Sequence, residues 1–172
     1  MKLKLKDIVL LALLSALMVA GDLLMEALPN VHFVGVLIVA TTVVYRKYAL
    51  LSIYVYVLIQ GIISGFDLWW VPYIYVWALL WCAVMLIPTI LPEKIKIVLY
   101  IAVCALHGFL FGTLYAPMQI LMFFGGDFSK MIPWIIAGIS FDIIHGISNL
   151  IGGTLLIYPI IKILKRSDKY VS

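Results

Sequence analysis

Charged residues are scarce in this chain of 172 residues. They make up 12% of the sequence, whereas hydrophobic residues make up 66%. A soluble domain of this length could not hide so much apolar surface in one core. The composition therefore excludes an ordinary soluble protein and predicts an all-α integral membrane protein, with residues 1–172 forming a single membrane domain.

Cysteine and histidine are also rare, with two and three residues. Cys82 and Cys104 fall inside apolar segments without the spacing of a metal site, so we expect two buried structural thiols, no metal and no cofactor. The net charge of +4 does not predict nucleic-acid binding, because the basic residues gather at the ends of apolar segments. The sequence contains no phosphate-binding loop of the Walker type.

The apolar segments predict six membrane spans. Lysine and arginine residues cluster before the first span and after every second span. This pattern is expected for a protein with both termini in the cytoplasm, because basic loop residues accumulate there. Only Lys130 falls on the outer side. The expected spans are Ile8–Leu28, Val31–Tyr45, Tyr48–Gly65, Val71–Leu91, Ile97–Phe124 and Met131–Leu164.

The last apolar segment carries three polar residues in its middle, Asp142, His145 and Asn149. Their spacing of three and four residues places them on one face of a helix. Ionisable groups within a bilayer usually face the protein interior or a water-filled cavity. We expect this face to contact a ligand or to line a pathway; the alternative is that the three residues hold helices together.

Most other polar and aromatic residues fall at the outer ends of the spans. Apolar and aromatic walls with a few convergent polar groups are typical of a small-molecule site. An interfacial aromatic belt is the alternative for the tryptophans. The predicted ligand-binding residues are Asn30, His32, Asp67, Trp69, Trp70, Tyr73, Gln119, Trp134, Asp142, His145 and Asn149.

Alanine recurs at every fourth position of the first span, at Ala12, Ala16 and Ala20. Small residues at this spacing form a smooth strip that another helix can approach closely. This strip either packs inside the six-helix body or binds a partner subunit.

Four segments together resemble the substrate-binding S component of energy-coupling factor (ECF) transporters. They read LLALLSALMVAGDLL, PNVHFVGVLIV, GFDLWWVPYIYVW and PWIIAGISFDIIHGISNLIGG, and the resemblance covers essentially the whole chain. It implies a multi-pass protein of a bacterial or archaeal plasma membrane that captures a vitamin or related organic nutrient from outside. It also implies a transmembrane coupling subunit and two ATP-binding subunits as partners, with Ala12 and Ala16 in the coupling motif and Ala20 extending it. The pocket does not match the thiamine, riboflavin, biotin or folate members residue by residue.

Two other functions stay open at this stage. A standalone secondary transporter could use Asp142 to carry protons, although no internal repeat is visible. An intramembrane enzyme could pair Asp142 with His145, but Ser140 lies five residues from His145 and points elsewhere. A haem or quinone protein using His107 and His145 is disfavoured because the two residues are expected at different depths.

Overall fold

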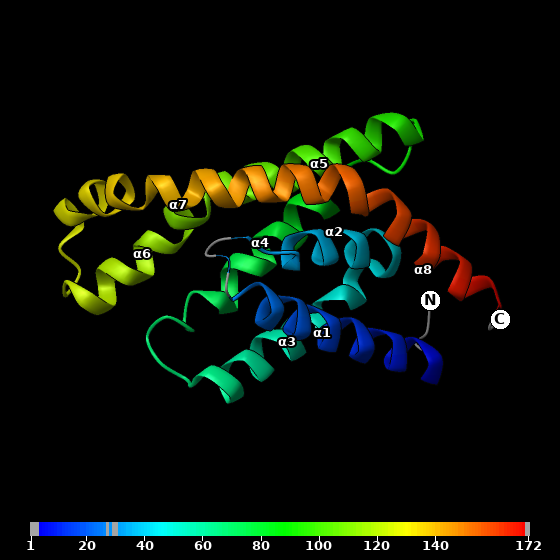
Figure 1. The fold of residues 1–172 in the computed structure, drawn as a ribbon, viewed down its shortest axis with the longest axis horizontal. Helices are drawn as coiled ribbons and strands as arrows, with labels where there is room; N and C mark the ends of the chain where they lie inside the picture. The colour runs from blue at the N-terminus through cyan, green and yellow to red at the C-terminus, as the bar shows by residue number, and fades with distance from the viewer. Residues whose placement is uncertain (1–3, 27, 29–30, 171–172) are drawn as a thin grey trace.

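The computed structural model describes residues 4–26, 28 and 31–170, and this part of the chain is helical without any strand. Figure 1 shows the arrangement. The helices are α1 (Leu5–Met25), α2 (Val34–Tyr45), α3 (Ala49–Ser64), α4 (Tyr73–Met85), α5 (Glu93–Phe109), α6 (Phe111–Phe123), α7 (Met131–Gly152) and α8 (Tyr158–Tyr170). Short 3-10 turns occur at η1 (Arg46–Tyr48) and η2 (Phe128–Lys130), and one π-helical turn, η3 (Gly153–Ile157), joins α7 to α8.

Each expected span contains a helix, and the all-helical class is confirmed. Four helical runs are long and apolar enough to cross a membrane, and Tyr73–Met85 is a shorter apolar helix. The four runs are Leu5–Met25, Val34–Ser64, Glu93–Phe123 and Phe128–Ser167. The run Val34–Ser64 reverses direction at Arg46, whose φ of 50° lies in the left-handed region, so α2 and α3 are separate helices.

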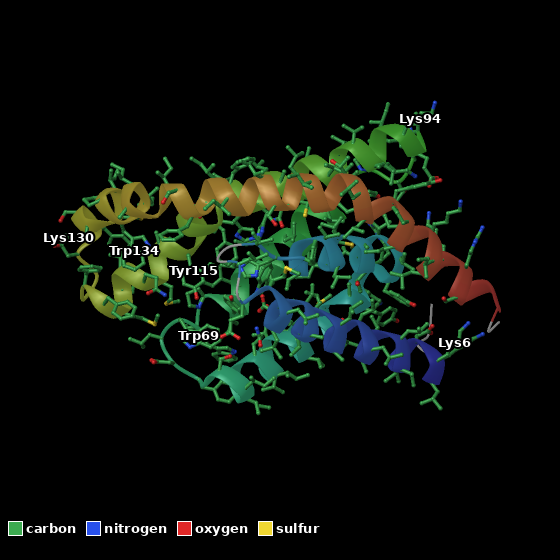
Figure 2. The ribbon with its side chains drawn as sticks, in the orientation of Figure 1. Lys6, Trp69, Lys94, Tyr115, Lys130 and Trp134 are labelled. Atoms are coloured by element: carbon green, nitrogen blue, oxygen red, sulfur yellow. The ribbon has the colours of Figure 1, made fainter. Side chains whose placement is uncertain are left out.

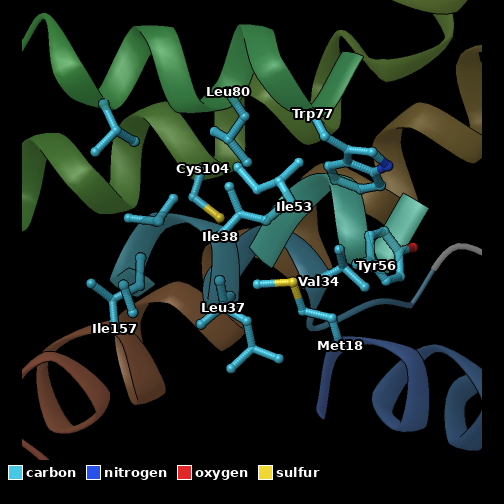
Figure 3. Packing of buried hydrophobic residues seen from close by; sticks show 14 of the residues in the cluster. Met18, Val34, Leu37, Ile38, Ile53, Tyr56, Trp77, Leu80, Cys104 and Ile157 are labelled. Carbon is cyan, nitrogen blue, oxygen red and sulfur yellow. The ribbon is translucent and has the colours of Figure 1, made fainter. Parts of the chain in front are cut away.

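Helix α2 forms the centre of the bundle. Ten of its twelve residues are buried, because it is apolar on every side and other helices surround it. At 1.5 Å per residue it is about 18 Å long, which is shorter than the hydrocarbon core of a bilayer. Figure 3 shows its residues Val34, Leu37 and Ile38 within the main apolar cluster, together with Met18 of α1 and Leu80 of α4.

Small residues bring two helix pairs into close contact. On α1, the Ser15 hydroxyl lies 2.9 Å from the carbonyl oxygen of Ser52 on α3 and donates to it. Between α5 and α7, a Cβ added at Gly108 would lie 2.9 Å from the Cα of Gly146. A side chain at position 108 would therefore force the two backbones apart.

The basic residues of several elements gather at one end of the molecule. Figure 2 shows Lys6 and Lys94 at this end, and Lys130 and Trp134 at the other. Lys165 of α8 lies 4.0 Å from Glu93 at the start of α5. At the turn after α2, the Arg46 guanidinium approaches the carbonyl oxygen of Met85 at the end of α4 (3.5 Å).

Large apolar side chains are exposed around the outside of the bundle, on α7 above all, where Ile136, Ile143 and Ile147 are 63%, 47% and 45% exposed. An apolar surface of this extent suits a lipid environment. Cys104 is buried as expected, but Cys82 is exposed on α4, so the expectation of a second buried thiol is wrong. Helical periodicity explains the difference, since the buried residues of α4 are Val76, Trp77, Leu80 and Val84.

Candidate ligand-binding site

A cavity of about 320 Å³ opens at the end of the bundle opposite the basic residues. It lies between the end of α1, the residue His32 that precedes α2, the end of α3 and the start of α4. Its size and mixed lining match those of small-molecule sites. The polar and aromatic lining residues are Asp22, Glu26, His32, Gln60, Ser64, Trp69 and Tyr73.

Asp22 is the most connected polar residue of the cavity. Its Oδ1 lies 2.8 Å from Nδ1 of His32, and its Oδ2 accepts a hydrogen bond of 2.9 Å from the Tyr56 hydroxyl. The side-chain amide of Gln60 also donates to Oδ2. Tyr56 and Gln60 are four residues apart, so α3 presents both on the same face. This network fixes a carboxylate at the wall of the cavity, where it can meet a positive charge or an N–H donor.

Aromatic rings form the other wall. The ring of Tyr73 makes edge-to-face contacts with Trp69 (5.4 Å between centroids) and with Trp77 one turn further along α4 (5.6 Å). The Tyr115 hydroxyl donates to the backbone carbonyl of Trp69 and thereby ties α6 to the loop before α4. Trp69 and Tyr73 line the cavity, and the edge-to-face contacts hold their rings in place as a rigid wall.

The charge of the lining is negative. Asp22 and Glu26 contribute carboxylates, and no lysine or arginine occurs among the described residues that line the cavity. A ligand with a cationic or N–H-rich group fits this lining better than an anion does.

Asp142, His145 and Asn149 do share one face of α7, as the spacing predicts. They are 7%, 3% and 0% exposed, whereas Ile144 and Ile147 between them are exposed. Their contacts nevertheless differ. The ring of His145 lies 5.3 Å from the ring of His32 and therefore adjoins the cavity lining.

The other two residues of this face join helices. The Asp142 carboxylate accepts a hydrogen bond of 2.8 Å from the backbone N–H of Gly112 in the first turn of α6. The Asn149 amide donates to the carbonyl oxygen of Cys104 on α5 (3.1 Å). A carboxylate at a helix N-terminus compensates unpaired N–H groups and the helix dipole. These contacts favour the helix-packing alternative for Asp142 and Asn149.

The structure brings only part of the predicted ligand set to the cavity. His32, Trp69 and Tyr73 line it, and His145 lies directly behind His32. Trp70 instead packs on α3, where its indole N–H donates to the carbonyl oxygen of Val57 (2.7 Å).

The remaining predicted residues lie elsewhere. Asp67 is exposed and accepts a hydrogen bond from the backbone N–H of its neighbour Leu68. Trp134 packs against Phe124 at the tip of the α6–α7 hairpin (6.1 Å), away from the cavity (Figure 2). Gln119 is buried in α6 and does not line the cavity. Asn30 lies outside the described residues.

Asp22, Tyr56 and Gln60 are absent from the predicted set, although they form the polar centre of the cavity. A signal for Asp22 was present, since it is an ionisable residue within an apolar helical segment, like Asp142. The pairing with Tyr56 and Gln60 depends on how α1 packs against α3, which residue spacing alone does not encode.

His107 lies closer to the cavity than its expected depth implies. Its ring and the ring of His145 both contact Phe111, with centroid distances of 5.8 and 4.8 Å. The expected mismatch in depth between the two histidines is therefore wrong, because the end of α5 packs closely against the middle of α7, where a Cβ added at Gly108 would lie 2.9 Å from the Cα of Gly146.

No protein-family model, curated protein or solved structure matches this chain.

Proposed function

We propose that this protein is the substrate-binding S component of an ECF-type importer, which captures a small organic nutrient from outside the cell. A transmembrane coupling subunit and two ATP-binding subunits would complete the transporter. The observation that carries the proposal is the cavity around Asp22, with its aromatic wall and its negative lining. The sequence resemblance to S components points in the same direction.

The proposal includes six membrane crossings with both ends of the chain in the cytoplasm. The clustering of Lys6, Lys94 and Lys165 at one end supports this orientation, because cytoplasmic segments are rich in basic residues. The cavity lies at the opposite end, so it faces the outside in this orientation. Helix α2 is short for a full crossing, but α1, α3, α4 and α8 pack around it and bury ten of its twelve residues, so its backbone is shielded within the bundle.

The alanine strip of α1 supports a partner-binding surface. Ala12, Ala16 and Ala20 are exposed, whereas Leu14 and Met18 on the other face of the helix are buried. This arrangement disfavours packing of the strip inside the bundle. A smooth exposed strip lets a helix of the coupling subunit approach closely.

Replacement of both Ala12 and Ala16 by leucine tests the partner assignment. We expect ATP-driven uptake to fall at least tenfold in vesicles that contain all subunits. The compound that copurifies with the protein is first identified by mass spectrometry. The affinity of the isolated double variant for this compound should stay within twofold of that of the unchanged protein. Ala102→Leu is the matched control, since Ala102 is an exposed alanine on α5. Normal uptake by the double variant would contradict the proposal.

A proton-coupled secondary transporter is the second candidate, because the Asp22–His32 pair in the cavity could carry a proton. The two candidates differ in their energy source. An S component gives no uptake alone, whereas a secondary transporter accumulates its substrate in vesicles that hold only this chain and a proton gradient. Such accumulation would replace the first proposal by the second.

A further inference from the structure

Three buried ring nitrogens lie behind the cavity without a hydrogen-bond partner among the residues that the structure describes. They are Nε1 of Trp77 on α4, Nδ1 of His107 on α5 and Nε2 of His145 on α7. The three residues are 2%, 6% and 3% exposed. Buried polar atoms are nearly always paired, and each one left unpaired costs about 1–3 kcal/mol. Three such atoms in one place therefore require an explanation.

All three rings surround the side chain of Phe111. Its centroid lies 5.4 Å from Trp77, 5.8 Å from His107 and 4.8 Å from His145. The Phe111 side chain has no polar atom, so it cannot form a conventional hydrogen bond with any of the three nitrogens. Figure 3 shows that Trp77 and Tyr56 lie at the same side of the apolar cluster, with the indole nitrogen and the phenol oxygen turned away from it.

The Phe111 ring also adjoins the cavity. It lies 6.4 Å from Tyr73, which lines the cavity, and His145 lies 5.3 Å from His32, which lines it as well. Phe111 is only half-buried and follows a break at Leu110 (φ −105°, ψ 4°), which separates α5 from α6. Rotation of this side chain would open a path from the cavity to the three nitrogens without disturbing an interior helical turn.

We propose that the space filled by the Phe111 ring is a second subsite, which receives a planar nitrogen heterocycle when that ring swings aside. The indole N–H of Trp77 donates to a ring nitrogen of the heterocycle. His107 uses its Nε2–H on the carbonyl oxygen of Val76 (3.0 Å), which leaves Nδ1 as an acceptor for an N–H group of the ligand. His145 Nε2 forms a third hydrogen bond, with a polar atom at the edge of the heterocycle. This inference rests on the proposed function for its biological role, and it names the class of nutrient.

The test uses the isolated full-length protein in nanodiscs and two probes of the same shape. 4-Aminopyrimidine carries ring acceptors and an amino donor, whereas aniline has the amino group without ring nitrogens. Binding is followed by the quenching of tryptophan fluorescence, with Trp77 in the subsite. In Phe111→Ala, we expect 4-aminopyrimidine to bind at least tenfold more tightly than in the unchanged protein, and at least tenfold more tightly than aniline.

Two further variants separate this subsite from an ordinary cavity. Ile120→Ala also removes a buried side chain of α6, but near the other end of the helix from Phe111, and should not increase 4-aminopyrimidine binding. Adding His107→Phe to Phe111→Ala should abolish the preference for 4-aminopyrimidine over aniline. If Phe111→Ala does not fold, Phe111→Leu serves in its place, with the same preference expected.

Equal affinities for the two probes in the Phe111 variant would overturn the subsite, and so would a gain of the same size in Ile120→Ala. Neither result depends on partner subunits or on uptake. The subsite and the importer assignment can therefore fail separately, since the latter is tested by the alanine strip of α1.

Discussion

Replacement of Asp142 by alanine should destabilise the protein while sparing ligand binding. The carboxylate accepts the backbone N–H of Gly112 at 2.8 Å and is 7% exposed. Alanine leaves that N–H unpaired, which costs about 1–3 kcal/mol. Asparagine keeps an acceptor oxygen and loses mainly the charge–dipole interaction, worth about 0.3–1 kcal/mol. We therefore expect a larger loss of unfolding free energy for Asp142→Ala than for Asp142→Asn.

The measurement is the free energy of unfolding in mixed micelles, followed by circular dichroism. Asp67→Asn is the control, because Asp67 is exposed in a loop and the change should stay within about 0.5 kcal/mol. Equal losses for alanine and asparagine, or a loss below about 0.5 kcal/mol for alanine, would refute the role of Asp142 as a cap of α6. A large loss of ligand affinity in a well-folded Asp142→Asn would return this residue to the binding site.

Two other predictions concern the α5–α7 contact and the loop between α6 and α7. Gly108→Ala should lower the free energy of unfolding by about 1–3 kcal/mol in the same assay, because the added Cβ would lie 2.9 Å from backbone atoms of α7. Gly138→Ala is the control and should not destabilise the protein, since a Cβ at that position would meet open space. In the loop, Ser129 donates two hydrogen bonds to Asp127, and these hold the pKa of the Asp127 carboxyl below its usual value. Ser129→Ala should raise this pKa, as measured by carbon NMR. Because the pKa of Asp127 is lowered in the folded protein, the two bonds stabilise the folded loop at pH values above the ordinary pKa of a carboxyl group. This stabilisation is lost as the pH falls through the lowered pKa. An unchanged pKa of Asp127 in Ser129→Ala would refute this role of Ser129.

The helical segments could be predicted well from the sequence, because their apolar length is a local property. The first and third expected spans differ from α1 and α3 by no more than three residues at either end. The breaks inside the fifth and sixth spans could not be predicted in this way. Just after the break at Leu110, Asp142 of α7 accepts a hydrogen bond from the start of α6, and such a contact becomes visible only in three dimensions.

The same distinction applies to the site. The shared face of Asp142, His145 and Asn149 follows from helical spacing, and the structure places all three in the interior. Spacing cannot tell which buried polar residue meets a cavity and which meets a neighbouring helix. The Asp142 carboxylate meets the N-terminus of α6, whereas the Asp22 carboxylate is held by Tyr56 and Gln60 of α3 at the wall of the cavity.

The cavity around Asp22 is the proposed ligand-binding site. The most direct measurement compares the affinity of Asp22→Asn and Asp142→Asn for the compound that copurifies with the unchanged protein, by isothermal titration calorimetry in the same detergent. We predict that Asp22→Asn weakens binding at least tenfold and that Asp142→Asn changes it less than twofold. Unchanged affinity in a folded Asp22→Asn, together with a loss in Asp142→Asn, would rule out the cavity and place the ligand on the α7 face instead.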